Sequence, residues 1–438
     1  MKRLNAEADR DRFLKKVEWL MLIMLFLMIG GFFTWSDNVG ITRVLKVVSR
    51  IGMTGFAIYM HQSIIKFGAV SSFKWKSIWS PFLYFTYIGL GFVSFLWSTD
   101  VGYSLLQWIM DMESLLFAFY FMKCLMLLDT YFPGHKIRFS NLMGNTVFIL
   151  MCIFVVGMTV APDNFFRLVE GGDDRRLGGY IMNPNELGMI CGLGISCLIF
   201  DLYQKNKRAW AIVKIAVLLL VLILTKSRSS LIGLLLIAFF HLRKLDSPLI
   251  KYAIYFGIAA VIPIGVEKLI MREGGIDDIL SMTGRAPFWK ALITEGLPRE
   301  PWFGFGFMRI DYKDTFSSVH SYTAHMTHNT FMQVLMNLGF VGITLALTQL
   351  TCTIRAFLQQ PEEKKLMLVG ILIPVLINSF TEFGIFGETN YGILFYQMLI
   401  FSISLSKHQR LTPSEKAFLA RNRPDLVLNP AGTGSLAA

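Results

Sequence analysis

Long apolar runs alternate with short polar connections along most of the chain. Each run is about as long as the roughly 20 residues that cross a bilayer as one helix. The runs lie at 17–36, 40–60, 78–98, 103–128, 142–161, 184–203, 210–226, 229–242, 251–270, 328–352, 365–380 and 391–406. This pattern predicts an all-α polytopic membrane protein with about twelve transmembrane helices. A long outer-face loop is expected between the ninth and tenth spans.

The run at 40–60 is less regular than the others because it carries three cations about one helical turn apart, Arg43, Lys46 and Arg50. Charged side chains inside a span usually face protein or water rather than lipid tails. We therefore expect a short or tilted helix whose basic stripe faces protein or headgroups.

Basic residues concentrate in alternate connections, which the positive-inside rule assigns to the cytoplasm. The first run follows a charged start and lacks a small-residue cleavage site, so it is expected to be a retained helix. The predicted segments are a cytoplasmic leader at 1–16, the first nine transmembrane helices at 17–270 with an outer loop at 162–183, a large periplasmic or extracellular loop at 271–327, the last three helices at 328–406, and a cytoplasmic tail at 407–438.

The composition excludes a water-soluble enzyme as the whole protein. Hydrophobic residues make up 54% of the chain and charged residues 16%, against about 25% charged in an average soluble domain. The net charge of +12 follows the predicted topology, so we expect no nucleic-acid partner. All five cysteines fall in apolar runs without metal-like spacing, which argues against a disulfide framework or a thiolate metal site.

A further group of cations falls on the predicted outer side, where the topology rule disfavours them. Its members are Arg175, Arg176, Lys226, Arg228, Arg272, Arg285, Lys290, Arg299 and Arg309. Such a cluster suggests an anionic ligand, and the guanidinium fork matches phosphate or diphosphate oxygens. Pairing with nearby acids or lipid phosphates is the alternative explanation for each member.

Two of these arginines have the most informative surroundings. Arg228 lies in a turn, residues 225–230, that separates two apolar runs and contains no acid. Arg285 follows Gly284 and precedes Pro287, a pattern typical of a turn or helix start that fixes a side chain.

His328 lies where the second outer loop enters the tenth span. A neutral imidazole there could take a proton from a hydroxyl group. Thr327 or Asn329 could cap the helix that follows. His325, with His320 as a third ligand, would instead suggest a metal site, but the spacing is weak evidence. Asp37, after the first span, is an alternative base.

Several motifs together resemble the O-antigen ligase/polymerase family of bacterial envelope glycosyltransferases. They lie within residues 175–345, and their order agrees with that family. The motifs are Arg176-Leu177-Gly178-Gly179, Asn183-Pro184-Asn185-Glu186-Leu187-Gly188, Ser227-Arg228-Ser229, Thr283-Gly284-Arg285, Pro301-Trp302-Phe303-Gly304-Phe305-Gly306, and His328-Asn329 followed by Gly339.

The resemblance implies a metal-independent, inverting transfer without a cofactor at the outer face of the bacterial cytoplasmic (inner) membrane. The donor would be a glycan on a polyprenyl diphosphate, bound by the counterparts of Arg176, Arg228 and Arg285. Arg175 could take the place of Arg176. The counterpart of His328 would activate the acceptor hydroxyl, and Glu382 would orient it or pair with an arginine. His325 and Asn329 are candidate supporting residues.

The family contains polymerases, whose acceptor is another lipid-linked glycan, and ligases, whose acceptor is lipid A-core. We favour an O-antigen or exopolysaccharide polymerase, with membrane lipids and a chain-length regulator or flippase as further candidate partners. A transporter or flippase for lipid-linked glycans is the alternative from another class. It predicts repeated halves and midplane charges, whereas these cations gather at one face.

Overall fold

The protein is described by a computed structural model. It describes residues 2–36, 38–68, 73–132, 135–168, 175–203, 208–243, 285–307, 327–382, 384–387, 389–407 and Ala417.

The described residues are mostly helical, and eleven of the twelve apolar runs coincide with a helix. The helices that match these runs are α1 (Lys2–Gly30), α2 (Val39–Gly68), α3 (Trp79–Val93), α4 (Val101–Tyr131), α5 (Phe139–Val160), α7 (Pro184–Tyr203), α8 (Arg208–Leu224), α9 (Arg228–Leu242), α14 (Thr330–Leu358), α15 (Glu362–Thr381) and α16 (Tyr391–Ser404). The run at 251–270 lies outside the described residues. This architecture fits the predicted all-α class.

Five helical segments are long and apolar enough to cross a membrane. They are Trp79–Leu96, Phe139–Val160, Pro184–Leu202, Thr330–Leu358 and Glu362–Thr381. Three shorter apolar helices, Ala209–Leu224, Arg228–Leu242 and Tyr391–Ser404, accompany them in the described part of the chain. These helices make a multi-pass membrane protein, while the count of twelve spans stays a prediction.

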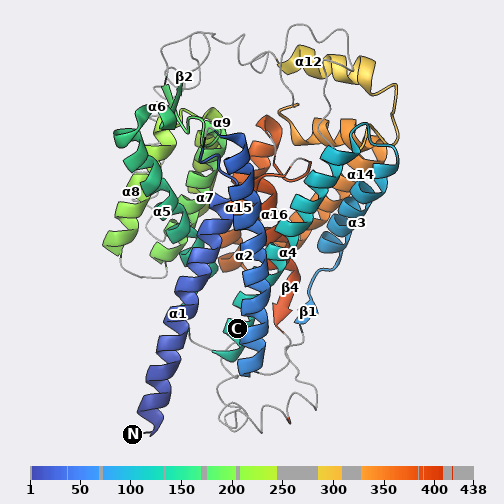
Figure 1. Ribbon diagram of the computed structural model, residues 1–438. Coiled ribbons are helices and arrows are strands. Elements are labelled where there is room, and N and C mark those ends of the chain that lie inside the picture. Colours follow the sequence, from blue (N-terminus) through green and yellow to red (C-terminus); the bar gives the residue numbers. More distant parts are fainter. Residues whose placement is uncertain are drawn as a thin grey trace.

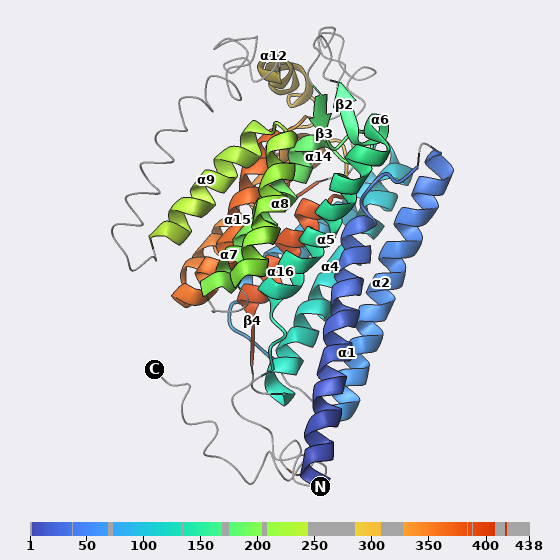
Figure 2. The same cartoon turned by 90° about the vertical axis from the view of Figure 1, so that its left-hand side faces the viewer.

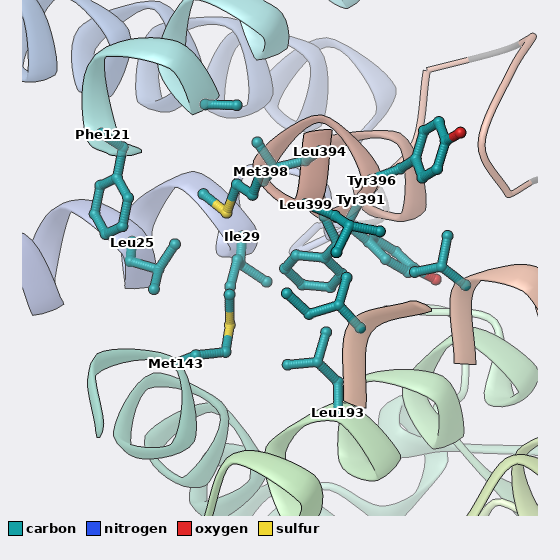
Figure 3. Packing of buried hydrophobic residues seen from close by; sticks show 14 of the residues in the cluster. Leu25, Ile29, Phe121, Met143, Leu193, Tyr391, Leu394, Tyr396, Met398 and Leu399 are labelled. Carbon is teal, nitrogen blue, oxygen red and sulfur yellow. The ribbon is translucent and has the colours of Figure 1, made fainter. Parts of the chain in front are cut away.

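Helix α16 forms the centre of the bundle, and every one of its residues is buried. It contacts α3, α4, α14 and α15. Figure 3 shows Leu394 and Met398 of α16 within a cluster that also contains Ile29 of α1 and Met143 of α5. A helix that is apolar on all sides is stable only when neighbours surround it. The four helices α3, α4, α14 and α15 therefore pack around α16.

Two short antiparallel ribbons, which the sequence pattern did not predict, close opposite ends of the bundle (Figures 1 and 2). Strand β1 (Phe73–Trp75) pairs with β4 (Leu405–Lys407). Strand β2 (Phe166–Leu168) follows the one-turn helix α6 (Pro162–Phe165) and pairs with β3 (Arg175–Leu177). Three residues per strand give too short an alternation to distinguish from a loop.

Arg50 in α2 is buried at 2% exposure and forms an ion pair with Glu113 of α4, Nη2 to Oε2 2.7 Å. The same nitrogen donates to the Met110 carbonyl oxygen at 2.9 Å. Arg43, seven residues earlier, is exposed. At Arg50 the basic stripe of the run at 40–60 therefore faces protein. The carboxylate of Glu113 supplies the negative charge that the buried guanidinium requires.

Candidate functional site

The candidate residues come together at the end of the bundle that carries the β2–β3 ribbon and the short helix α12 (Arg285–Ala291) (Figures 1 and 2). The beginnings of α7, α9 and α14 and the end of α15 are joined there by hydrogen bonds. Helix starts carry a partial positive charge, and three of them meet here. An anion is therefore favoured at this end of the bundle.

The carboxylate of Glu382 lies at the centre of the contacts. Its Oε2 is 2.7 Å from His328 Nδ1, and its Oε1 accepts from Asn185 Nδ2 at 2.8 Å. Arg285 Nη2 lies 3.5 Å from the same Oε1. Glu382 is only 3% exposed, so these partners offset the cost of burying its charge.

The pKa of Glu382 reflects the balance between burial and these partners. Burial alone raises the pKa of the carboxyl group. The hydrogen bond from His328 opposes that effect, together with Arg285 and Asn185, and the pKa falls below its ordinary value. Glu382 is therefore an anion at neutral pH.

His328 is held in an unusual backbone conformation beside this carboxylate. Its φ of 51° lies in the left-handed region, which costs a non-glycine residue about 1–2 kcal/mol. The preceding Thr327 is fixed on both sides, because its carbonyl oxygen accepts from Trp289 Nε1 at 2.8 Å and its N–H donates to Gln333. These contacts direct the imidazole of His328 toward Glu382.

Asn329 caps helix α14 and does not join the carboxylate contacts. Its Oδ1 accepts from the N–H groups of Phe331 and Met332 at 2.9 and 3.1 Å. Its Nδ2 donates to the Phe380 carbonyl oxygen at 3.4 Å. Asn329 therefore positions the start of α14 just after His328.

Arg285 begins α12 and connects it to the end of α15. Its Nη1 donates to the Thr381 carbonyl oxygen at 2.5 Å. Its Nε is buried and has no hydrogen-bond partner among the described residues. A buried guanidinium donor without a partner is costly, so the other two nitrogens carry the contacts that hold Arg285 in place.

Of the two neighbouring arginines in β3, Arg176 is the one that reaches this network. Its Nη2 donates to Asn185 Oδ1 at 2.7 Å and its Nε to the Thr225 carbonyl oxygen at 2.9 Å. Arg175 is exposed and lines a separate surface hollow with Arg167. Asn185 thus links Arg176 to Glu382, which orients the guanidinium toward the site.

Arg228 is the first residue of α9 and is half-buried. It follows the turn whose Thr225 carbonyl oxygen accepts from Arg176. Ser230, in the first turn of α9, donates to the Asn185 carbonyl oxygen at 3.0 Å, and Lys226 in the preceding turn has a left-handed φ of 50°. The turn therefore places Arg228 on a segment that contacts both Arg176 and Asn185.

The glycine-rich segment at 301–306 docks into a break in α14. Gly339 has a φ of 62° inside this helix, and a Cβ there would lie 2.3 Å from the Trp302 carbonyl carbon. The N–H of Phe340 donates to the Pro301 carbonyl oxygen at 2.8 Å, and that of Gly306 donates to Asn337 at 2.8 Å. The backbone groups released at the break are thus satisfied by the docked segment.

Several candidates lie outside the described residues. These are Asp37, Arg272, Arg309, His320 and His325, together with 271–284 and 308–326 of the predicted outer loop. Lys290 and Arg299 are both exposed. Within the described ranges, no group of three His, Cys, Asp or Glu side chains could hold a metal ion.

Sequence reasoning missed the roles of Asn185 and Trp289. Asn185 belongs to the motif at 183–188, so the repeated Asn around Pro184 was the signal available for it. Trp289 gave no such signal, since its contact with Thr327 joins residues 38 positions apart.

Residues 215–347 match the family model described as O-Antigen ligase (Wzy_C). The match contains Arg228, Arg285 and His328, whereas Arg176 and Glu382 lie outside it. No curated protein matches the chain. Residues 215–347 therefore form an O-antigen ligase domain, which is consistent with the O-antigen ligase/polymerase family that the motifs resemble.

Proposed function

We propose that this protein is a membrane glycosyltransferase that transfers a glycan from a polyprenyl-diphosphate donor at the outer face of the cytoplasmic membrane. The observation that carries the proposal is the contact of one buried carboxylate, Glu382, with both His328 and Arg285. The match of residues 215–347 supports an O-antigen ligase or polymerase type of function.

His328 acts as the general base in this proposal. The hydrogen bond to Glu382 favours the tautomer with a proton on Nδ1, which places the basic lone pair on Nε2. Nε2 accepts the proton of the acceptor hydroxyl as its oxygen attacks the anomeric carbon. The bond from this carbon to the diphosphate oxygen breaks, its electron pair leaves with the polyprenyl diphosphate, and the configuration inverts.

The arginines bind the diphosphate and stabilise the charge that develops on it. Arg176 and Arg285 are oriented by Asn185, Glu382 and backbone carbonyls before any ligand arrives. Preorganised donors of this kind are among the largest contributions to catalysis, worth about 3–4 kcal/mol each. Arg228 completes the set, while the exposed Arg175 is left out of it. The transfer proceeds without a metal ion.

The acceptor distinguishes the two candidate activities. A polymerase transfers to a second lipid-linked glycan, and we favour this activity for an O-antigen or exopolysaccharide. A ligase transfers to lipid A-core, and the description of the matching family model favours this second candidate. Both use the same donor site and the same base. A flippase would require neither His328 nor its carboxylate partner for activity.

Reconstituted Arg228→Ala and Arg285→Ala variants test the donor site. Each should lower the rate of glycan transfer by about 10²- to 10³-fold, as expected when a preorganised donor to a developing charge is removed. Insertion into liposomes should be unchanged, and transfer by the wild type should persist in EDTA. Full activity of both variants would exclude the proposed diphosphate site. Loss of wild-type activity in EDTA, restored by adding a divalent ion, would exclude the metal-independent mechanism.

A further inference from the structure

A cavity of about 540 Å³ lies at the opposite end of the bundle from the candidate site. Lys364, near the start of α15, lines it, whereas Glu382 directly follows the end of that helix. A helix of 20 residues is about 30 Å long, which is the thickness of the hydrocarbon core. The cavity and the site therefore lie toward opposite faces of the membrane.

The cavity is lined by three cations from separate segments, Lys76 after β1, Arg138 before α5, and Lys364 in α15. Lys364 Nζ donates to the Ser402 carbonyl oxygen at 2.5 Å, which uses one of its three N–H donors. No salt bridge joins any of the three to a carboxylate in the described part of the chain. Asp129 and Asp201 act on Lys364 and Arg138 only at longer range, so positive charge converges here without a directly paired counter-ion.

Two carboxylates also line the cavity but do not neutralise it. Asp129 Oδ1 is 2.9 Å from His135 Nε2, and Glu363 is exposed in the first turn of α15. Three cations against two acids leave a net positive charge. The arrangement therefore selects an anion rather than a cation.

The remaining wall of the cavity is apolar and rich in methionine. Methionine side chains are flexible and adapt to ligands of irregular shape, such as hydrocarbon chains. The apolar lining comes from Met122, Leu125, Met126, Phe200, Met367 and Phe401. A ligand that fits both walls has an anionic head and a hydrocarbon body.

We propose that this cavity binds an anionic phospholipid of the leaflet opposite the catalytic site. Its phosphate contacts Lys76, Arg138 and Lys364, and its acyl chains lie along the methionine-rich wall. Basic pockets between transmembrane helices on the cytoplasmic side bind such headgroups. The predicted orientation places all three cations on that side. The bound lipid would join the ends of α4, α5, α15 and α16 to the β1–β4 ribbon.

The test compares the thermal unfolding of the full-length purified protein in detergent with added dioleoyl-phosphatidylglycerol or dioleoyl-phosphatidylcholine. The wild type should show a higher melting temperature with phosphatidylglycerol only. The double variant Lys76→Gln with Arg138→Gln should lose most of this shift. Both side chains are exposed, so the lipid-free protein should still fold.

The matched control is Lys365→Gln. Lys365 follows Lys364 but pairs with Glu362 at 2.6 Å and lines a different hollow. This variant should keep the wild-type shift, and native mass spectrometry should detect bound phosphatidylglycerol on it but not on the double variant. An equal shift in the double variant would overturn the site. If water-soluble glycerol phosphate raised the melting temperature of the wild type equally, the ligand would be a soluble phosphate compound and not a lipid.

Discussion

At the scale of residues, a small number of hydrogen bonds determines which side chains face the site. Arg175 and Arg176 are neighbours of identical type, yet only Arg176 reaches Asn185 and Thr225. The sequence pattern puts both in the loop predicted at 162–183 but does not choose between them. The choice depends on Asn185, which itself bonds to Glu382, a residue 197 positions away.

The two arginines form a matched pair for mutation. Arg176→Ala should reduce glycan transfer by about 10²-fold or more, because it removes an oriented donor to the diphosphate. Arg175→Ala should change the rate by about twofold or less, as for an ordinary surface substitution. Initial rates in proteoliposomes at equal protein density measure both. Equal losses in the two variants would contradict the assignment of Arg176 alone.

Glu382 should make stability depend on pH in the acid range. Because its folded pKa is lowered from 4.5, the ionised carboxylate stabilises the protein above pH 4.5, and this stabilisation is lost as the pH falls through the lower folded value. Glu382→Gln should therefore melt below the wild type at neutral pH, and the difference should narrow below pH 4.5. Melting temperatures across this range test the prediction, which a constant difference would refute.

At the scale of elements, the helix break at Gly339 shows what the hydrophobic pattern alone could predict. The pattern correctly predicted a helix over most of α14, since apolar residues continue through this position. It gave no indication that the segment at 301–306 fills a break there. The backbone hydrogen bonds between this segment and α14 join positions far apart in the chain, and hydropathy carries no information about such docking.

Gly339→Ala should unseat the glycine-rich segment. The new methyl group would lie 2.3 Å from the Trp302 backbone at a φ of 62°, so we expect a loss of about 1–3 kcal/mol of stability and reduced transfer. Thermal unfolding in detergent measures the first effect. Gly52→Ala in α2 is the control, because its Cβ would meet no atom within 4 Å, and it should be neutral or stabilising. Similar melting of the two variants would argue against the docked break.

At the scale of the whole molecule, the two ends of the bundle differ in kind. One end gathers His328, Glu382 and the arginines from segments far apart in sequence, and the other holds the basic cavity. The positive-inside pattern predicted this polarity in outline, because the outer cations were the ones without a topological explanation. The short ribbons and the central position of α16 could not be predicted, since they arise from packing between helices rather than from any local pattern.

The proposed function requires His328 as the base that activates the acceptor hydroxyl during glycan transfer from a lipid-linked donor. Its most direct test is product formation in proteoliposomes that contain a purified polyprenyl-diphosphate glycan, with and without lipid A-core, comparing wild type with His328→Ala. Transfer by the wild type should be lost in the variant. Products that lengthen without lipid A-core would identify a polymerase, and transfer only with lipid A-core would identify a ligase. Undiminished transfer by His328→Ala would contradict the role of His328, and no transfer by the wild type with either acceptor would contradict the proposed glycosyltransferase function.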